Sequence, residues 1–172
     1  MRSCILLLLI FSADAQTAQS PLPNSALNDP AGQRILFQLH TLANSVQIYT
    51  CRQTDHGFAW SGPDPDAILT NSDGKLIVHH YKGPVWEATD GSIVRSEGKL
   101  AKHFLADKED AVHWLELPAL EPTKQFGRMT FIHRVDTAGG LPPSDKVCDA
   151  QHAGEQERVK YSATYLFYGP KS

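Results

Sequence analysis

The segment from His79 to Ser92 holds the densest group of side chains that could do chemistry. Two histidines, a tryptophan and two acids lie around two turn signals, Lys82-Gly83 and Asp90-Gly91. A carboxylate beside a histidine fixes the tautomer of the imidazole and raises its basicity, so such a pair can relay protons or provide part of a metal site. This segment is therefore the candidate functional site of the sequence.

Two-residue turns at these signals would decide which side chains of the segment share a face. His80 would then lie opposite Val85 and diagonally from Glu87, roughly 7–8 Å away between Cα atoms. We predict a candidate site of His80 and Glu87, with Asp90 in the adjoining turn. The competing interpretation is a hydrogen-bonded His–Glu pair that only stabilises the hairpin.

The same register predicts a second, aromatic face. It places Trp86 opposite Arg95, where a guanidinium over the indole ring would form a cation–π contact. Together with Trp60 and Trp114, Trp86 either belongs to the structural core or lines a groove on which a sugar stacks. A small molecule or a glycan is therefore the class of partner that the sequence suggests.

Metal binding finds little support in the segment. Neighbouring residues of a strand point to opposite faces, so His79 and His80 cannot both face one ion. Position 82, which would share a face with His80, is lysine and not a second histidine. Further ligands would have to come from His113 or His133 on other strands. We expect neither a metal nor a cofactor.

The elements that must position these residues are short alternating runs typical of half-buried strands. Arg34 to His40 alternates except at Leu36, so a short helix competes with a strand there. Ser61 to Asp66 has the composition of a turn. Lys99 to Asp110 favours one short helix or a long loop. Further alternating runs cover residues 45–52, 75–81, 111–117, 127–137 and 159–168. We predict a mainly β fold, an antiparallel β-sandwich or barrel with at most one or two short helices.

The N-terminal residues have the pattern of a secretory signal peptide. An apolar run, Ile5 to Phe11, follows Arg2 and precedes Ala13-Asp14-Ala15, a small-x-small cleavage pattern. The run is too short to cross a bilayer, so we expect no transmembrane segment. The predicted organisation is a signal peptide over 1–15, a flexible arm over 16–33 and a single β domain over 34–172. The location is secreted or extracytoplasmic, and periplasmic in a bacterium.

The net charge and the cysteine content indicate which partners and which cellular compartment to expect. The net charge is −3 and the basic residues are scattered singly, which argues against a nucleic-acid partner. Cys4 leaves with the signal peptide, so Cys51 and Cys148 remain as a pair in an oxidising compartment. We predict a disulfide between them; two separately buried thiols are the alternative.

A series of motifs in order along the chain resembles the secreted fungal and bacterial family called domain of unknown function 3455. The resemblance covers residues 34 to 168 and rests on Tyr49-Thr50-Cys51, Phe58-x-Trp60, Pro65-Asp66-Ala67, His80-Tyr81-x-Gly83-Pro84-x-Trp86-Glu87, Asp90-Gly91-Ser92, Trp114-Leu115, Arg134-Val135-x-Thr137-x-Gly139-Gly140, Cys148 and Tyr161-x-Ala163-x-Tyr165-x-Phe167-Tyr168.

The family resemblance implies no established activity. Some similar proteins carry a malate dehydrogenase label, but this chain has no Gly-x-Gly-x-x-Gly motif and no βαβ alternation to bind a dinucleotide, so we do not expect that activity. The sequence favours a secreted, disulfide-bonded module that binds a ligand or associates with a surface. The alternative is a metal-assisted or acid–base enzyme that uses His80 and Glu87.

Overall fold

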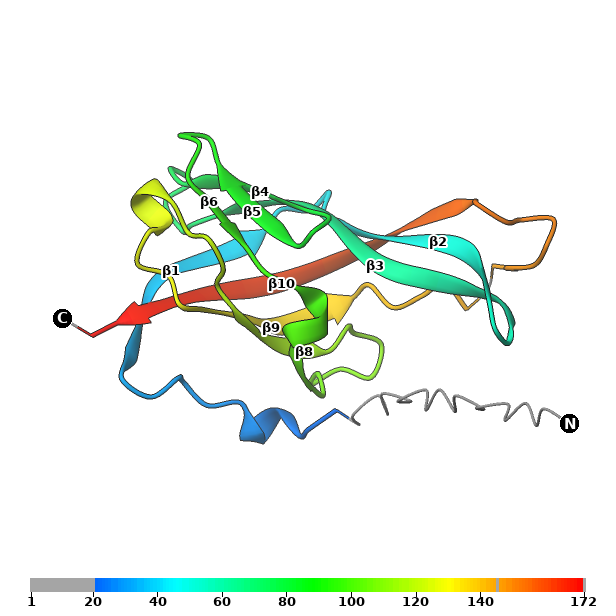
Figure 1. Cartoon of the computed structure of the whole chain (residues 1–172), viewed down its shortest axis with the longest axis horizontal. Coiled ribbons are helices and arrows are strands. Elements are labelled where there is room, and N and C mark those ends of the chain that lie inside the picture. The colour runs from blue at the N-terminus through cyan, green and yellow to red at the C-terminus, as the bar shows by residue number, and fades with distance from the viewer. Residues whose placement is uncertain (1–20, 145, 172) are drawn as a thin grey trace, which may run out of the picture.

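The alternating runs pair into one antiparallel sheet, shown in a computed structural model that describes residues 21–144 and 146–171 (Figure 1). The described strands are β1 (Gln33–Thr41), β2 (Val46–Thr54), β3 (Gly57–Thr70), β4 (Ile77–Tyr81), β5 (Val85–Ala88), β6 (Ile93–Arg95), β7 (Lys102–Phe104), β8 (Trp114–Pro118), β9 (Phe131–Gly139) and β10 (Gln156–Pro170). Three 3-10 turns are η1 (Asn24–Ala26), η2 (Gly98–Leu100) and η3 (Lys124–Phe126). The prediction of a mainly β fold with few short helices is confirmed.

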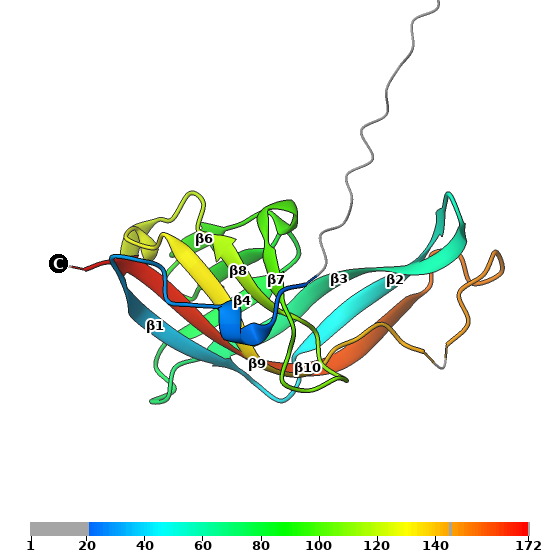
Figure 2. The ribbon, with the colours of Figure 1, turned by 90° about the horizontal axis from the view of Figure 1, so that it is seen from below.

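The sheet curls until its two ends approach each other. Its order is β6-β5-β4-β3-β1-β10-β9-β8-β7, and β2 pairs with both β10 and β3. At the β6 end, Arg95 exchanges two backbone hydrogen bonds with Leu120, just after β8, at 2.9 and 2.8 Å. The inner faces of distant strands therefore surround one interior, while the hairpin end of β2 and β3 and the start of β10 project away from it (Figures 1 and 2).

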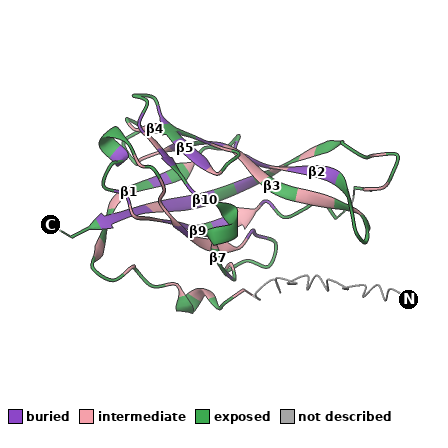
Figure 3. Ribbon diagram, in the orientation of Figure 1, coloured by how far each residue is buried: buried purple, intermediate pink, exposed green. Residues whose placement is uncertain are grey.

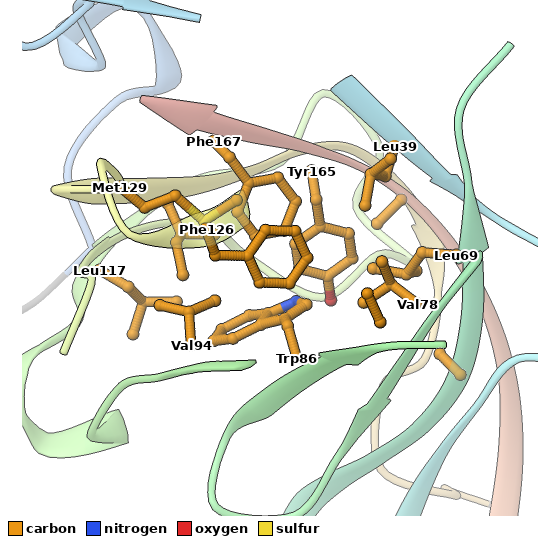
Figure 4. Close-up of a cluster of buried hydrophobic side chains, with 14 of the residues drawn as sticks. Leu39, Leu69, Val78, Trp86, Val94, Leu117, Phe126, Met129, Tyr165 and Phe167 are labelled. Atoms are coloured by element: carbon orange, nitrogen blue, oxygen red, sulfur yellow. The ribbon is translucent and has the colours of Figure 1, made fainter. Parts of the chain in front are cut away.

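The core fills one part of this interior with aromatic and aliphatic side chains (Figure 4). Trp86 of β5 is 0 % exposed and meets Tyr165 and Phe167 of β10 edge to face, with ring centroids 5.9 and 6.1 Å apart. Buried residues gather along β5, β9 and β10 (Figure 3). Large rings contribute most of the apolar burial, so this cluster anchors the strands around it.

One local prediction, strand or short helix over Arg34 to His40, needed the pairing pattern to resolve it. Arg34 to His40 forms a strand, and the register of β1 against β10 shifts between Ile35 and Phe37. Leu36 is therefore the extra residue of a β-bulge, which explains why it interrupts the alternation.

One other local prediction is wrong and a second is incomplete. Ser61 to Asp66 is not a turn but the middle of β3, which remains paired with β2 through a register shift between Ile48 and Thr50. Such an irregularity accommodates glycine and proline within a paired strand. Lys99 to Asp110 contains strand β7 after turn η2, because residues 102–104 pair with β8.

The predicted disulfide between Cys51 and Cys148 is present, with a sequence separation of 97. It joins β2 to the loop between β9 and β10 at the projecting end of the sheet. The bridge therefore fastens a part of the fold that lies away from the aromatic core.

The segment before β1 runs alongside the sheet from Leu22 onward. Leu22 donates its backbone N–H to the carbonyl of His103 and accepts from Leu105, at 2.9 and 2.7 Å. Further along, the Tyr168 hydroxyl donates to Asp29 at 2.6 Å. The predicted signal peptide and residues 16–20 of the predicted arm lie outside the described residues. Among the described residues, no helix has the length and apolar character needed to cross a membrane.

Candidate functional site

Both turns around the predicted site are one residue longer than expected, which changes the register. Tyr81 pairs with Val85, leaving Lys82, Gly83 and Pro84 in the first loop. Glu87 pairs with Ile93, and Ala88 donates to the Ser92 carbonyl at 2.8 Å around the second loop. The predicted pairing of His80 with Val85 is therefore wrong: His80 lies opposite Trp86, and Glu87 lies opposite His79.

His80 points into the interior of the curled sheet and is 3 % exposed. Its ring stacks on Trp86 with centroids 4.3 Å apart, and its Nδ1–H donates to the carbonyl of Val85 at 2.9 Å. This bond defines the tautomer, since a carbonyl oxygen can only accept, and Nε2 is left as an acceptor. Burial lowers the pKa of His80 to about 3, so the ring is neutral at ordinary pH.

Glu87 lies on the outer face of the same hairpin. It accepts from the Tyr81 hydroxyl at 2.9 Å, and nearby His79 lies 3.1 Å from Asp66, which also accepts from Arg158 at 2.6 Å. These groups line a shallow surface depression of about 600 Å³. Because strand neighbours alternate, Glu87 and His80 are on opposite sides of the sheet, and the predicted His80–Glu87 pair does not form.

Asp90 has the contacts of a turn residue. Its carboxylate accepts from the Ser92 backbone N–H and hydroxyl at 2.8 and 3.0 Å, and these bonds lower the pKa of Asp90. Its carbonyl accepts from Lys124 at 2.6 Å. Asp90 therefore holds the loop between β5 and β6 against η3.

The three tryptophans are in different settings. Trp60 pairs with Cys51 across β2 and β3 and donates to the Lys146 carbonyl at 3.2 Å, while Trp114 is half-buried at the start of β8. The predicted contact of Arg95 with Trp86 is wrong, because Arg95 pairs with Val85 and lies 3.7 Å from Glu121. Of the three indoles, Trp86 is the one that lines a second cavity, which is partly open to the surface at Lys82 and Gly83.

This cavity of about 490 Å³ continues the interior beyond the aromatic core. It lies among the middle of β3, the loop after β4 and the segment from η2 to β7. The indole nitrogen of Trp86 and the phenol oxygen of Tyr165 are drawn near each other within the core cluster (Figure 4), and both residues line the cavity. Polar atoms thus meet apolar walls in a space of the size that holds small molecules in proteins.

Gln47 of β2 projects into the cavity wall and is 1 % exposed. Neither the oxygen nor the nitrogen of its side-chain amide has a hydrogen-bond partner among the described residues, and the same holds for Nε1 of Trp86. A buried polar group without a partner costs about 1–3 kcal/mol. These atoms have almost no accessible surface, so a molecule in the cavity would pair with them only after a side chain turns toward it.

Arg134 of β9 brings a positive charge to the same cavity and is 8 % exposed. Its Nε and Nη2 donate to the carbonyl of His113 at 3.2 and 2.7 Å. No carboxylate of residues 21–144 or 146–171 pairs with this guanidinium. The neighbouring His103 also lines the cavity. Its pKa is lowered by burial first, and then by the charges of His113 and Arg134.

The other histidines considered as metal ligands do not join His80. His133 follows Ile132 and precedes Arg134 on β9, so its ring lies on the opposite face, where it contacts Tyr168 and Glu116. The ring of His113 lies against His103, with centroids 5.9 Å apart. Within the described residues no group of three or more histidine, cysteine, aspartate or glutamate side chains has metal-binding geometry.

Sequence reasoning missed Gln47 and Arg134, although each carried a signal. Arg134 is in phase with Ile132, which is buried, and Gln47 is in phase with Tyr49, which is also buried. A charged or amide side chain in phase with the buried residues of a strand faces the interior and needs a partner there.

Comparisons with known proteins place the chain by family. No curated protein and no solved structure matches it significantly. The family model described as "Protein of unknown function (DUF3455)" matches residues 30–169. The chain therefore belongs to this family, as its motifs predicted.

Proposed function

We propose that the protein is a secreted binding module that holds a small organic molecule in the cavity beside Trp86. The observation that carries the proposal is Gln47, a residue of the cavity lining whose buried amide has no partner for either polar atom among the described residues. Evolved interiors pair nearly all their polar groups, so an unpaired amide at the wall of a cavity indicates a site that is completed by a bound molecule.

Secretion is supported by two features at different places in the chain. The N-terminal residues have the pattern of a signal peptide, and the disulfide between Cys51 and Cys148 is a bond that persists in oxidising compartments. Expression of the whole chain in a secretory host, followed by mass measurement of the exported protein, tests this part. A product that begins at Gln16 is expected, and a product that retains the first 15 residues inside the cell would contradict it.

The enzyme alternative requires His80 and Glu87 to act together at one site. The register of β4 and β5 holds them on opposite faces of the sheet, and the lowered pKa of His80 makes it a poor base. A glycan groove would need at least two tryptophans on one surface, and only Trp86 among the three lines the large cavity. Neither alternative matches the arrangement of polar groups as well as a small ligand in the cavity does.

A screen of small molecules against a cavity-filled variant tests the proposal. The library contains neutral, anionic and cationic compounds, and the readout is the thermal unfolding temperature of the purified protein. Ala101→Phe places a ring at the cavity wall, and the control Ala59→Phe adds the same ring at an exposed position on β3. Compounds that stabilise the wild type and the control but not Ala101→Phe are expected. Stabilisers that act equally on all three proteins, or a library without stabilisers, would overturn the proposal.

A further inference from the structure

The cavity carries one positive charge that no acid of the protein neutralises. Arg134 is buried in its wall, and its hydrogen bonds to the His113 carbonyl satisfy only one edge of the guanidinium. The other charges of the lining, Asp64 and Lys82, pair with each other at 2.7 Å. A buried charge without a counter-charge is costly, so the site has a net requirement for one negative charge.

The geometry of Arg134 leaves a defined donor edge for such a charge. Nε and Nη2 share the His113 carbonyl, which holds the plane of the group in place. The guanidinium also lies beside the Tyr165 hydroxyl: burial raises the pKa of that phenol, and the charge of Arg134 and a hydrogen bond with it act in the opposite direction. His113 and Tyr165 together use at most three of the five N–H donors of Arg134, so two remain for a ligand. Two parallel N–H groups at the end of a guanidinium match the two oxygens of a carboxylate.

The rest of the lining argues for an organic acid with a single charge. His80 and His103 are neutral because burial lowers the pKa of both, so they add no positive charge for a phosphate dianion. Leu115, Leu117 and Ala101 provide apolar walls that suit a hydrocarbon body. Gln47 belongs to the same lining, and its covered amide could donate to or accept from a second polar group of the ligand once the side chain turns toward the cavity.

We propose that the natural ligand is a small organic monocarboxylate whose carboxylate pairs with Arg134 and whose apolar body lies against β8. This inference rests on the proposed function, because it names the class of molecule that the same cavity would hold. It adds a role for Arg134 that the family description does not contain.

Matched acids and amides test the charge requirement. Benzoate and cyclohexanecarboxylate are compared by calorimetry with benzamide and cyclohexanecarboxamide, which have the same bodies without the charge, and inorganic phosphate serves as the anion without a body. Each acid is expected to bind at least about tenfold more tightly than its amide, since a charge-assisted hydrogen bond exceeds a neutral one by this order. Phosphate is expected to bind more weakly than either acid.

Variants of Arg134 show whether the guanidinium is responsible. Arg134→Gln should weaken binding of the acids about 10- to 100-fold and leave the amides nearly unchanged, while Arg134→Lys, which keeps the charge, should lose less. Arg128→Gln is the control, because Arg128 is an exposed arginine outside the cavity lining. Far-UV circular dichroism verifies the fold, and Arg134→Lys provides the comparison if the glutamine variant does not fold.

The outcomes separate this inference from the proposed function. Library compounds that bind in the cavity but are neutral or cationic would overturn the carboxylate inference and leave the binding function intact. Acids that bind Arg134→Gln as tightly as the wild type would also overturn it. If no compound of any class binds in the cavity, both proposals fail.

Discussion

The replacement Gln47→Leu separates a binding role of this side chain from a structural one. Leucine has a similar volume but no polar atoms, so it removes an amide whose oxygen and nitrogen both lack protein partners. If a side chain contributes to the stability of the fold, its replacement should lower the free energy of unfolding. If a side chain instead serves to bind a ligand, its replacement should weaken ligand binding and make the free protein more stable. Binding sites are strained or have unsatisfied polar groups when the ligand is absent.

The size of the effect follows from the environment of the amide. Two buried polar atoms without partners would cost about 1–3 kcal/mol each in a dry interior. If the Gln47 side chain turns toward the cavity of about 490 Å³ in the free protein, water there recovers much of this cost. We therefore expect Gln47→Leu to raise the free energy of unfolding by about 1 kcal/mol. For a chain of this length that corresponds to an increase of about 2–4 °C in the unfolding temperature.

Equilibrium unfolding in urea, together with calorimetry, measures this difference in the absence of added ligand. Gln38→Leu is the control, because Gln38 is exposed on β1, where its side-chain amide lies 3.3 Å from the His40 ring nitrogen. The control should change stability by less than about 0.5 kcal/mol. Compounds found in the cavity screen should bind Gln47→Leu about tenfold more weakly than they bind the wild type.

The result that would refute this reasoning is a loss of stability. If Gln47→Leu lowers the free energy of unfolding by 1 kcal/mol or more, on the order of a lost hydrogen bond, the amide has a structural partner in solution. An unchanged affinity for every cavity ligand would likewise show that Gln47 does not contact them.

Three further predictions concern stability. The pKa of His80 is about 3 in the folded state and about 6.5 when unfolded, so its stabilising contribution is present above pH 6.5 and is lost as the pH falls. Urea unfolding should therefore show a free energy of unfolding that is about 2 kcal/mol lower at pH 5 than at pH 7 because of this group. This part of the pH dependence should be absent in His80→Phe. The double replacement Cys51→Ser/Cys148→Ser opens a loop with a sequence separation of 97 and should lower the free energy of unfolding by up to about 4.7 kcal/mol, measured by urea unfolding; no change would mean that the bridge is absent in solution. An added Cβ at Gly140 would lie 2.8 Å from Cβ of Tyr161, whereas at Gly154, also with positive φ, it meets nothing within 4 Å. Calorimetry should therefore find Gly140→Ala more destabilising than Gly154→Ala by about 1–3 kcal/mol, and equal losses would contradict the packing argument.

Patterns within single strands carried the predictions that proved correct. Alternation over residues 127–137 and 159–168 depends only on the period of a strand with one buried face, so β9 and β10 were predictable without knowledge of their partners. The disulfide was predictable from the cysteine count once Cys4 was assigned to the signal peptide. Each of these inferences uses information that is local or compositional.

The candidate site depended on information that local patterns do not contain. One additional residue in the first loop, Pro84, moved His80 away from Glu87 and onto Trp86, and one in the second loop, Thr89, put Val94 instead of Arg95 opposite Trp86. A shift of one residue exchanges the two faces of a strand, so the error in loop length changed every contact of the predicted pair. Turn signals identify where a chain reverses, but the loop length is decided by how the strands pack.

The sequence by itself determined that this chain forms short antiparallel strands with a disulfide, because burial on one face imposes a period that can be read from the residues in order. Only the tertiary structure decided which polar residues meet. Gln47, His80 and Arg134 come from β2, β4 and β9, and they line one cavity because the sheet curls until these strands face a common interior. That curvature is set by the packing of Trp86, Tyr165 and their neighbours, and no segment of the chain encodes it alone.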